Sequence, residues 1–442
     1  MTTTTLILPE WIAPVAPAET VLTAHAVVVE DRWIRAVLPR GQALAAYPQA
    51  TVIERPGHLL TPGFVNLHTH AAMALMRGCG DDLPLKQWLE SCIWPSEARV
   101  ASHDFVADGS LLAAYEMLMG GVTTFNDMYF FPDATAASAR ALGMRAALGL
   151  IVIGFPSAWA TTPDDYLSKG LAVRDRLKDD PLLSFCLAPH APYTVDDDTL
   201  RQVAVLADEL DLPIHIHVHE TAGEVASGLR QHGLRPLARL ERLGLLTPHL
   251  IAVHAVHLDG VDIRLLAGAG ASVAHCPHSN LKLASGLAPV AALLDAGVPI
   301  GIGTDGSASN NRLDLLSEAR TAALLAKGTS GRADCWPAPK VLRSMTLEGA
   351  CALGLDDRIG SIEAGKEADM VSFDLSAIEL QPVYDPIAQL IHAAGREHLR
   401  DVWIQGQSVV SKRQLASTQA TNAVGEVVAR ASMWQNRICP TP

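Results

Sequence analysis

Eight apolar stretches, each followed by a longer stretch with helical patterning, fill the middle of this 442-residue chain. They lie at residues 64–70, 122–129, 145–153, 183–190, 214–220, 250–258, 271–280 and 299–305. Nearly continuous apolar runs are typical of strands in a parallel sheet that is buried on both faces. About eight strand–helix units in succession predict an α/β fold, a (β/α)8 barrel of the TIM type.

Short strand-like runs with turn residues flank this pattern at both ends of the chain. Residues 27–37 predict a hairpin, because Asp31 and Arg32 interrupt two strand-like pieces. We therefore expect one small β-sandwich domain built from both chain ends. The expected divisions are 1–60 and 359–420 for the β-sandwich, 61–358 for the barrel, and 421–442 for a C-terminal tail with helical patterning.

Charge and cysteine usage exclude several classes of protein. The formal net charge of −13 disfavours nucleic acid and anionic membranes as partners, and a small neutral or cationic substrate is compatible with it. The seven scattered cysteines contain no Cys-x-x-Cys pair, which indicates reduced thiols rather than disulfides. Without a signal-peptide pattern or a stretch that could span a bilayer, the expectation is a cytoplasmic protein. A homo-oligomer is compatible with a barrel of this size.

Polar side chains gather at the C-terminal ends of the predicted strands. In strand order they are His68 and His70, Asn126 and Asp127, His190, His217 and Glu220, His254 and His257, His275, and Asp305. Barrel enzymes place their chemistry at this rim. Histidines that served only as core residues would not favour one end of so many strands.

Three histidines and one aspartate form a candidate metal site. His68 and His70 are two residues apart in a strand, so both imidazoles point to one face. With His217 and Asp305 they suit a divalent ion, most readily zinc, although iron or manganese would also fit. Such an ion lowers the pKa of a bound water to about 7.

Acid–base groups accompany these ligands. Glu220 is a candidate general acid, Asp305 can take the proton of the water, and His254 can hydrogen-bond the water or the developing oxygen anion. Strict alternation in the strand puts His217 and His219 on one face and Glu220 on the other. Glu220 can therefore reach the site only if the strand ends near residue 218 or 219, and by spacing alone His219 competes with His217 as the ligand.

Other polar residues near the rim have simpler readings. His257 and His278 are expected to be structural or rim residues, and Cys276 a small buried hydrophobe. Asn126 and Asp127 would either line the pocket or cap a helix or loop.

Several motifs together resemble the amidohydrolase superfamily, and within it the branch of 5′-methylthioadenosine/S-adenosylhomocysteine deaminases and their s-triazine hydrolase relatives. The motifs are PGFVNLHTH at 62–70, APHAPY at 188–193, HIHVHET at 215–221, HAVHL at 254–258, HCPHSNLKLASGLAP at 275–289 and GTDGSASNN at 303–311. The resemblance extends over nearly the whole chain.

The resemblance implies one zinc ion held by His68, His70, His217 and Asp305, which favours His217 over His219. It gives acid–base and water-orienting roles to Glu220, His254 and Asp305. Binuclear members carry a carbamylated lysine at the end of the fourth strand, where this chain has His190, and this difference also implies a single metal.

The same resemblance extends to the substrate through LKQWL at 85–89 and WPSE at 94–97. It implies that Trp88 covers the substrate, that Glu97 binds the ribose hydroxyl pair, and that His190 contacts the nucleoside. The implied reaction is hydrolytic deamination: water adds to C6 of adenine, Glu220 protonates N1, and Asp305 passes the water's proton to the departing amino group.

The residues also indicate which nucleoside is preferred. A homocysteine tail needs a cationic partner such as arginine, and residues 148–166 contain none. Phe155, Trp159 and Met73 would suit a methylthio group, which predicts 5′-methylthioadenosine over S-adenosylhomocysteine, with adenosine as a further candidate. The alternatives are a related enzyme acting on a guanine-type base, a cytosine-type base or an s-triazine, and, from another class, a non-catalytic barrel scaffold.

Overall fold

The computed structural model describes residues 3–439 and divides into two compact units. One unit contains the chain up to Val65, Glu116–Thr124 and Asp314–Thr421. The other contains Asn66–Tyr115, Phe125–Leu313 and the chain from Asn422. The domain boundaries expected above stay predictions.

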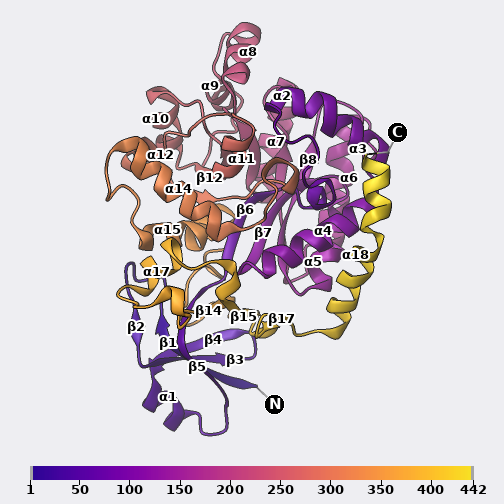
Figure 1. The fold of residues 1–442 in the computed structure, drawn as a ribbon. Coiled ribbons are helices and arrows are strands. Elements are labelled where there is room, and N and C mark those ends of the chain that lie inside the picture. Colours follow the sequence, from indigo (N-terminus) through magenta and orange to yellow (C-terminus); the bar gives the residue numbers. More distant parts are fainter. Residues whose placement is uncertain (1–2, 440–442) are drawn as a thin grey trace. The chain divides into compact units, whose positions relative to one another are not determined.

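The residues of the polar rim lie in or shortly after the strands of an eight-stranded sheet, whose strands follow one another in sequence order. Its strands are β6 (Phe64–Thr69), β7 (Val122–Tyr129), β8 (Arg145–Val152), β9 (Leu183–Pro189), β10 (Ile214–Val218), β11 (Leu250–His254), β12 (Ser272–His275) and β13 (Ile300–Ile302). Figure 1 labels β6, β7, β8 and β12 of this sheet. Neighbouring strands from β8 to β13 pair in parallel. Every residue of β6, β7 and β8 is buried, which explains why the apolar runs hardly alternate. The expected α/β barrel is confirmed.

Helices follow the strands as the sequence pattern predicts. They are η1 (Ala71–Met76), α2 (Leu85–Trp88), η2 (Leu89–Ile93), α3 (Trp94–Val100), α4 (His103–Leu118), α5 (Pro132–Ala141), α6 (Pro163–Leu177), α7 (Asp197–Leu210), α8 (Ala222–His232), α9 (Pro236–Arg242), α10 (Gly260–Ala269), α11 (Pro277–Lys282), α12 (Val290–Asp295) and α13 (Ser307–Asn310). Several begin where a side-chain oxygen accepts from the first turn: Thr162 before α6, Asp196 before α7, Thr221 before α8 and Asp259 before α10.

The expected β-domain from both chain ends is also confirmed, as a mixed nine-stranded sheet. Its strands are β1 (Thr4–Ile12), β2 (Leu22–Thr23), β3 (His25–Glu30), β4 (Trp33–Pro39), β5 (Thr51–Pro62), β14 (Met370–Asp374), β15 (Leu399–Ile404), β16 (Gln407–Ser411) and β17 (Gln414–Leu415). The N-terminal and C-terminal segments join where β5 and β14 pair antiparallel, with Pro62 opposite Met370. Between β3 and β4 lies the predicted hairpin turn, in which Asp31 adopts a φ of 52°.

The unit that contains this sheet also has helices. They are α1 (Arg40–Ala46), α14 (Leu315–Ser330), α15 (Ala338–Met345), α16 (Leu347–Ala352), η3 (Ile378–Leu380), α17 (Pro386–His392) and η4 (Arg396–His398). Its core includes Ile7, Val27, Leu60, Met370 and Trp403, which come from both ends of the chain. The sheet therefore buries apolar residues that neither chain end could cover by itself.

The C-terminal tail is the helix α18 (Thr418–Ile438). Arg430 and Trp434 both donate to the carboxylate of Asp108 on α4, at 2.6 and 2.8 Å, and Trp434 packs edge-on against Phe105. None of the helices within residues 3–439 combines the length and apolar character needed to cross a membrane.

Candidate active site

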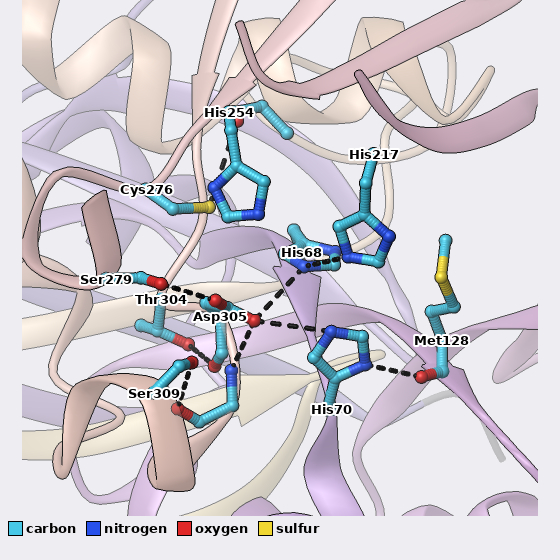
Figure 2. A network of polar contacts seen from close by, with 12 residues as sticks. His68, His70, Met128, His217, His254, Cys276, Ser279, Thr304, Asp305 and Ser309 are labelled. Carbon is cyan, nitrogen blue, oxygen red and sulfur yellow. Dashed lines mark hydrogen bonds and ion pairs between the residues drawn. The ribbon is translucent and has the colours of Figure 1, made fainter. Parts of the chain in front are cut away.

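Side chains from three strand ends meet at one point of the rim. Nε2 of His68 and Nε2 of His70 lie 3.2 and 3.3 Å from Oδ1 of Asp305. Nε2 of His217 lies 3.3 Å from Nε2 of His68. Figure 2 shows these residues around the Asp305 carboxylate, with His254 beside them. The structure thus brings together the four residues that the sequence singled out as candidate ligands.

The hydrogen-bond partner of Nδ1 in each imidazole determines which ring nitrogen carries the proton. Nδ1 of His70 lies 2.6 Å from the Met128 carbonyl, and Nδ1 of His217 lies 2.6 Å from the His190 carbonyl. Because a carbonyl oxygen only accepts, both Nδ1 atoms carry a proton and both Nε2 atoms present a lone pair to the common point.

His68 completes this arrangement through a second histidine. Its Nδ1 lies 2.9 Å from Nε2 of His215, so Nδ1 of His68 can hold the proton and leave Nε2 of His68 with a lone pair that faces the common point. Three nitrogen lone pairs and a carboxylate facing one point are the donor set of a divalent cation. The residues present therefore fit a single metal ion.

Burial fixes the charge of this cluster. Burial lowers the pKa of His68 to about 4 and holds the pKa of His217 well below its usual value. Burial raises the pKa of Asp305, but the hydrogen bond that His68 donates when it is protonated, with the charges of protonated His68 and His70, outweighs this effect, and the pKa lies well below its usual value. At neutral pH, His68 and His217 are neutral and Asp305 is a carboxylate, which favours binding of a dication.

Local backbone geometry aims Asp305 at the histidines. Asp305 has a φ of 59°, and its backbone N–H donates to the His68 carbonyl at 3.0 Å. The Ser279 hydroxyl donates to Oδ2 at 2.6 Å, and the Gly306 N–H donates to Oδ1 at 2.7 Å. A Cβ atom on Gly303 would lie 2.9 Å from the Cβ of His68, so a larger residue there would displace the ligand cluster. The contact from Ser279 was not predicted, although Ser279 lies in the 275–289 motif.

The end of β10 separates His217 from His219. The strand ends at Val218, and His219 has a φ of 58°, which breaks the alternation of side chains. The ring of His219 points away from the metal site: its Nδ1 lies 3.0 Å from the His257 carbonyl, and its Nε2 accepts from the Leu237 N–H at 3.1 Å. Of the two, His217 faces the common point.

The turn that begins at His219 also brings Glu220 into the pocket. The backbone N–H groups of His219 and Glu220 donate to the two carboxylate oxygens of Glu224 at 2.9 and 2.8 Å, which fixes the turn. Oε1 of Glu220 accepts from the Ser285 hydroxyl at 3.3 Å. Burial raises the pKa of Glu220. Glu220 is therefore disposed to hold a proton.

His254 lies beside Glu220, with 3.9 Å between its Nε2 and Oε2 of Glu220. Its Nδ1 lies 2.9 Å from Oδ1 of Asn280, so Nδ1 carries the proton and Nε2 is an acceptor. Asn280 lies in the same 275–289 motif, but its contact with His254 could not be read from the motif alone.

A pocket of about 730 Å³, which includes open solvent at its mouth, adjoins this cluster. Trp88, Glu97 and His190, the predicted substrate contacts, all line it, together with Met73 and Phe155. Trp159 is not among the residues that line the pocket within the described chain. It packs against Phe131 with 5.1 Å between ring centroids, so its expected role beside a methylthio group is not supported.

Two of the predicted contacts are held in place by neighbours. The Tyr129 hydroxyl donates to Oε1 of Glu97 at 2.7 Å, and although Glu97 remains partly exposed, burial raises its pKa to about 7. Nδ1 of His190 lies 3.0 Å from Oγ1 of Thr194, and burial lowers the pKa of His190 to about 3. Tyr129 was not predicted, although it closes the strand that carries Asn126 and Asp127.

The remaining rim residues have structural contacts. Asp127 accepts from the N–H of Ala71, the first residue of η1, at 2.7 Å, as the capping alternative predicts. Asn126 donates to the Leu67 carbonyl at 3.1 Å, and Nε2 of His257 lies 2.6 Å from the Ser285 carbonyl.

Comparison with known proteins extends these observations. Residues 59–409 match the Amidohydrolase family. A 5-methylthioadenosine/S-adenosylhomocysteine deaminase of Teredinibacter turnerae is 44% identical over 428 residues, which are 97% of this chain and 96% of that protein. The crystal structure of an adenosine deaminase from Xanthomonas campestris, with bound zinc, has a TM-score of 0.95 at 50% identity and covers 98% of both chains. An atrazine chlorohydrolase from Arthrobacter aurescens, complexed with zinc, has a TM-score of 0.89 at 24% identity over 97% of this chain and 100% of its own; this likeness concerns the fold alone.

Proposed function

Because the chain belongs to the amidohydrolase family, we propose that it is a metal-dependent deaminase of 5′-methylthioadenosine. In the proposed reaction, one water and the nucleoside give ammonia and the corresponding inosine derivative. The observation that carries the proposal is the convergence of three imidazole lone pairs and the Asp305 carboxylate beside Glu220 and His254. The deaminases among its relatives support the reaction type.

The proposed metal is a single zinc ion held by His68, His70, His217 and Asp305. The nitrogen-rich donor set and the zinc in a relative of 50% identity support this choice, while iron and manganese accept similar ligands. When bound, the ion would act as a Lewis acid that lowers the pKa of a water molecule to about 7. At the end of β9 this chain has His190, whose side chain is neutral, rather than a lysine, which supports one ion rather than two.

The protein's own groups would move the protons. Glu220, whose pKa is raised by burial, would donate a proton to N1 of the adenine ring as C6 becomes tetrahedral. Asp305 accepts one proton of the attacking water and passes it to the amino group, which leaves as ammonia, and the second proton of the water returns to Glu220 as the C6 carbonyl forms. Because its proton sits on Nδ1 toward Asn280, His254 accepts at Nε2 and orients the water.

The pocket walls suit a nucleoside. Glu97 can accept from two vicinal ribose hydroxyls while Tyr129 donates to one of its oxygens. Trp88 would cover the substrate, and His190 would contact it. No arginine or lysine is among the lining residues within the described chain, while Met73, Ile151, Ile153 and Phe155 are among them. This lining supports a methylthio group rather than a charged homocysteine tail at the 5′ position.

A substrate panel tests the proposal. Ammonia release should be highest in kcat/KM for 5′-methylthioadenosine, lower for adenosine and S-adenosylhomocysteine, and absent for guanine, cytosine and an s-triazine. Turnover of a free base or a triazine alone would reject the nucleoside assignment. Equal or higher kcat/KM for S-adenosylhomocysteine would reject the argument from the apolar lining.

Glu97→Ala separates a nucleoside from a free-base substrate. Loss of a charge-assisted contact to ribose should raise KM for 5′-methylthioadenosine about tenfold or more, with a smaller change in kcat. Since the pKa of Glu97 is about 7 and only the carboxylate accepts from both hydroxyls, KM of the unaltered enzyme should also rise as the pH falls through about 7. Steady-state kinetics between pH 6 and pH 8.5 would show both effects. A KM that changes neither on substitution of Glu97 nor with pH would contradict the role of Glu97.

A further inference from the structure

Lys282, the last residue of α11, lies at the centre of a closed polar network. Its Nζ lies 2.6 Å from Oδ1 of Asp81, 2.7 Å from Oδ1 of Asn311 and 2.9 Å from the Ala308 carbonyl. An ammonium group has three protons, so each acceptor can receive one of them. Nδ2 of Asn311 also donates to Oδ2 of Asp81 at 3.0 Å, which closes the network.

The network joins three segments that contribute to the pocket. The segment of Lys282 continues into Leu283, which lines the pocket, and the segment of Ala308 and Asn311 includes Ser309, which also lines it. Asp81 lies in the loop before α2, the helix that ends at Trp88. The segment before Trp88 is therefore tied to α11 and α13 by the Lys282 ammonium, together with the Asn311–Asp81 hydrogen bond and the bond that Arg77 donates to the Asn311 carbonyl.

The loop around Asp81 depends on such a tie because its backbone lacks regular structure. Gly78, Gly80 and Asp82 have φ values of 77°, 73° and 63°, so the chain reverses repeatedly within a few residues. A Cβ atom on Gly80 would lie 3.1 Å from Cδ1 of Trp88, so the indole packs directly on bare loop backbone. The Trp88 Nε1–H also donates to the Cys79 carbonyl at 3.1 Å. Displacement of this loop would displace Trp88 with it.

We infer that Lys282 is a positioning residue that fastens the loop of Asp81, and through it Trp88, to α11 and α13 beside the nucleoside pocket. This inference rests on the proposed function for its substrate. Lys282 takes no part in the side-chain hydrogen bonds that Ser279 makes with Asp305 and Asn280 makes with His254. Its loss should therefore weaken substrate binding and spare the acid–base step.

Lys282→Met tests the inference, since methionine keeps most of the apolar stem and removes the ammonium. KM for the best substrate of the panel should rise about tenfold, the size expected for one charge-assisted hydrogen-bond network. The turnover number should stay within about twofold, and the metal content should not change. Amide hydrogen exchange, which needs no substrate, should become faster in peptides covering 77–93. Lys178→Met is the matched control, because Lys178 pairs with Asp175 on the surface, and neither KM nor exchange should change.

A second pair of variants keeps the test decisive if Lys282→Met folds poorly. Asp81→Ala should reproduce the rise in KM and the faster exchange, and the double variant should be no worse than the more impaired single variant. Lys282→Arg, which keeps the charge, should recover part of the KM. A lower kcat at unchanged KM, or unchanged exchange in 77–93 in both single variants, would overturn the inference. The exchange result stands even if the substrate panel rejects the proposed function.

Discussion

Glu220→Gln is expected to lower kcat by about 10²–10⁴-fold, the usual contribution of a general acid. The amide has nearly the same shape and can still accept from the Ser285 hydroxyl, but its N–H groups are not acidic enough to transfer a proton to the ring nitrogen. Because Glu220 is outside the proposed ligand set, the metal content should match that of the unaltered enzyme. Ammonia release under saturating substrate and metal analysis of the same samples would measure both quantities.

The control for this substitution is Glu209→Gln, an exposed carboxylate on α7 that undergoes the same chemical change away from the pocket. It should leave kcat unaltered. If Glu220→Gln retained kcat within about tenfold, a group other than Glu220 would have to protonate the ring. A loss of metal in Glu220→Gln would instead indicate that the carboxylate supports the ligand cluster.

His217→Ala and His219→Ala are expected to have different effects, although the two residues are only two positions apart. His217→Ala removes a proposed ligand, so metal affinity should fall by more than the factor of about 100 that losing an outer hydrogen-bond partner can cost. Turnover should fall with it. His219→Ala should keep the metal, because its ring contacts the His257 carbonyl and the Leu237 N–H instead.

The cost of His219→Ala should appear in stability. The buried Leu237 N–H that it leaves without its partner would lower the free energy of unfolding by about 1–3 kcal/mol, whereas the His257 carbonyl still accepts from Arg235 at 2.7 Å. Metal per chain after gel filtration, kcat and thermal unfolding would distinguish the two variants. Metal lost from His219→Ala but kept by His217→Ala would reverse the assignment of the ligand.

The succession of apolar segments in the sequence determined the barrel, because a strand buried on both faces must be apolar along nearly its whole length. The short strands at both chain ends likewise indicated the β-domain, and the two sets join into one sheet where β5 pairs with β14. The positions of His68, His70, Glu220 and Asp305 at strand ends were also readable. In a parallel barrel, every strand end points to the same rim, so separation in sequence does not matter.

Tertiary structure alone decided the details on which the chemistry depends. Alternation could not separate His217 from His219, because the deciding feature is the positive φ of His219 at the end of β10. Nor could spacing reveal that Asn280 sets the proton of His254 or that Tyr129 supports Glu97.

Lys282 and Asp81 give the clearest case, since they form their ion pair across 201 positions of the chain. Periodicity reports which face of its own strand or helix a residue occupies. Hydrogen bonds between different loops depend instead on where the whole barrel brings those loops, and only the folded chain determines that.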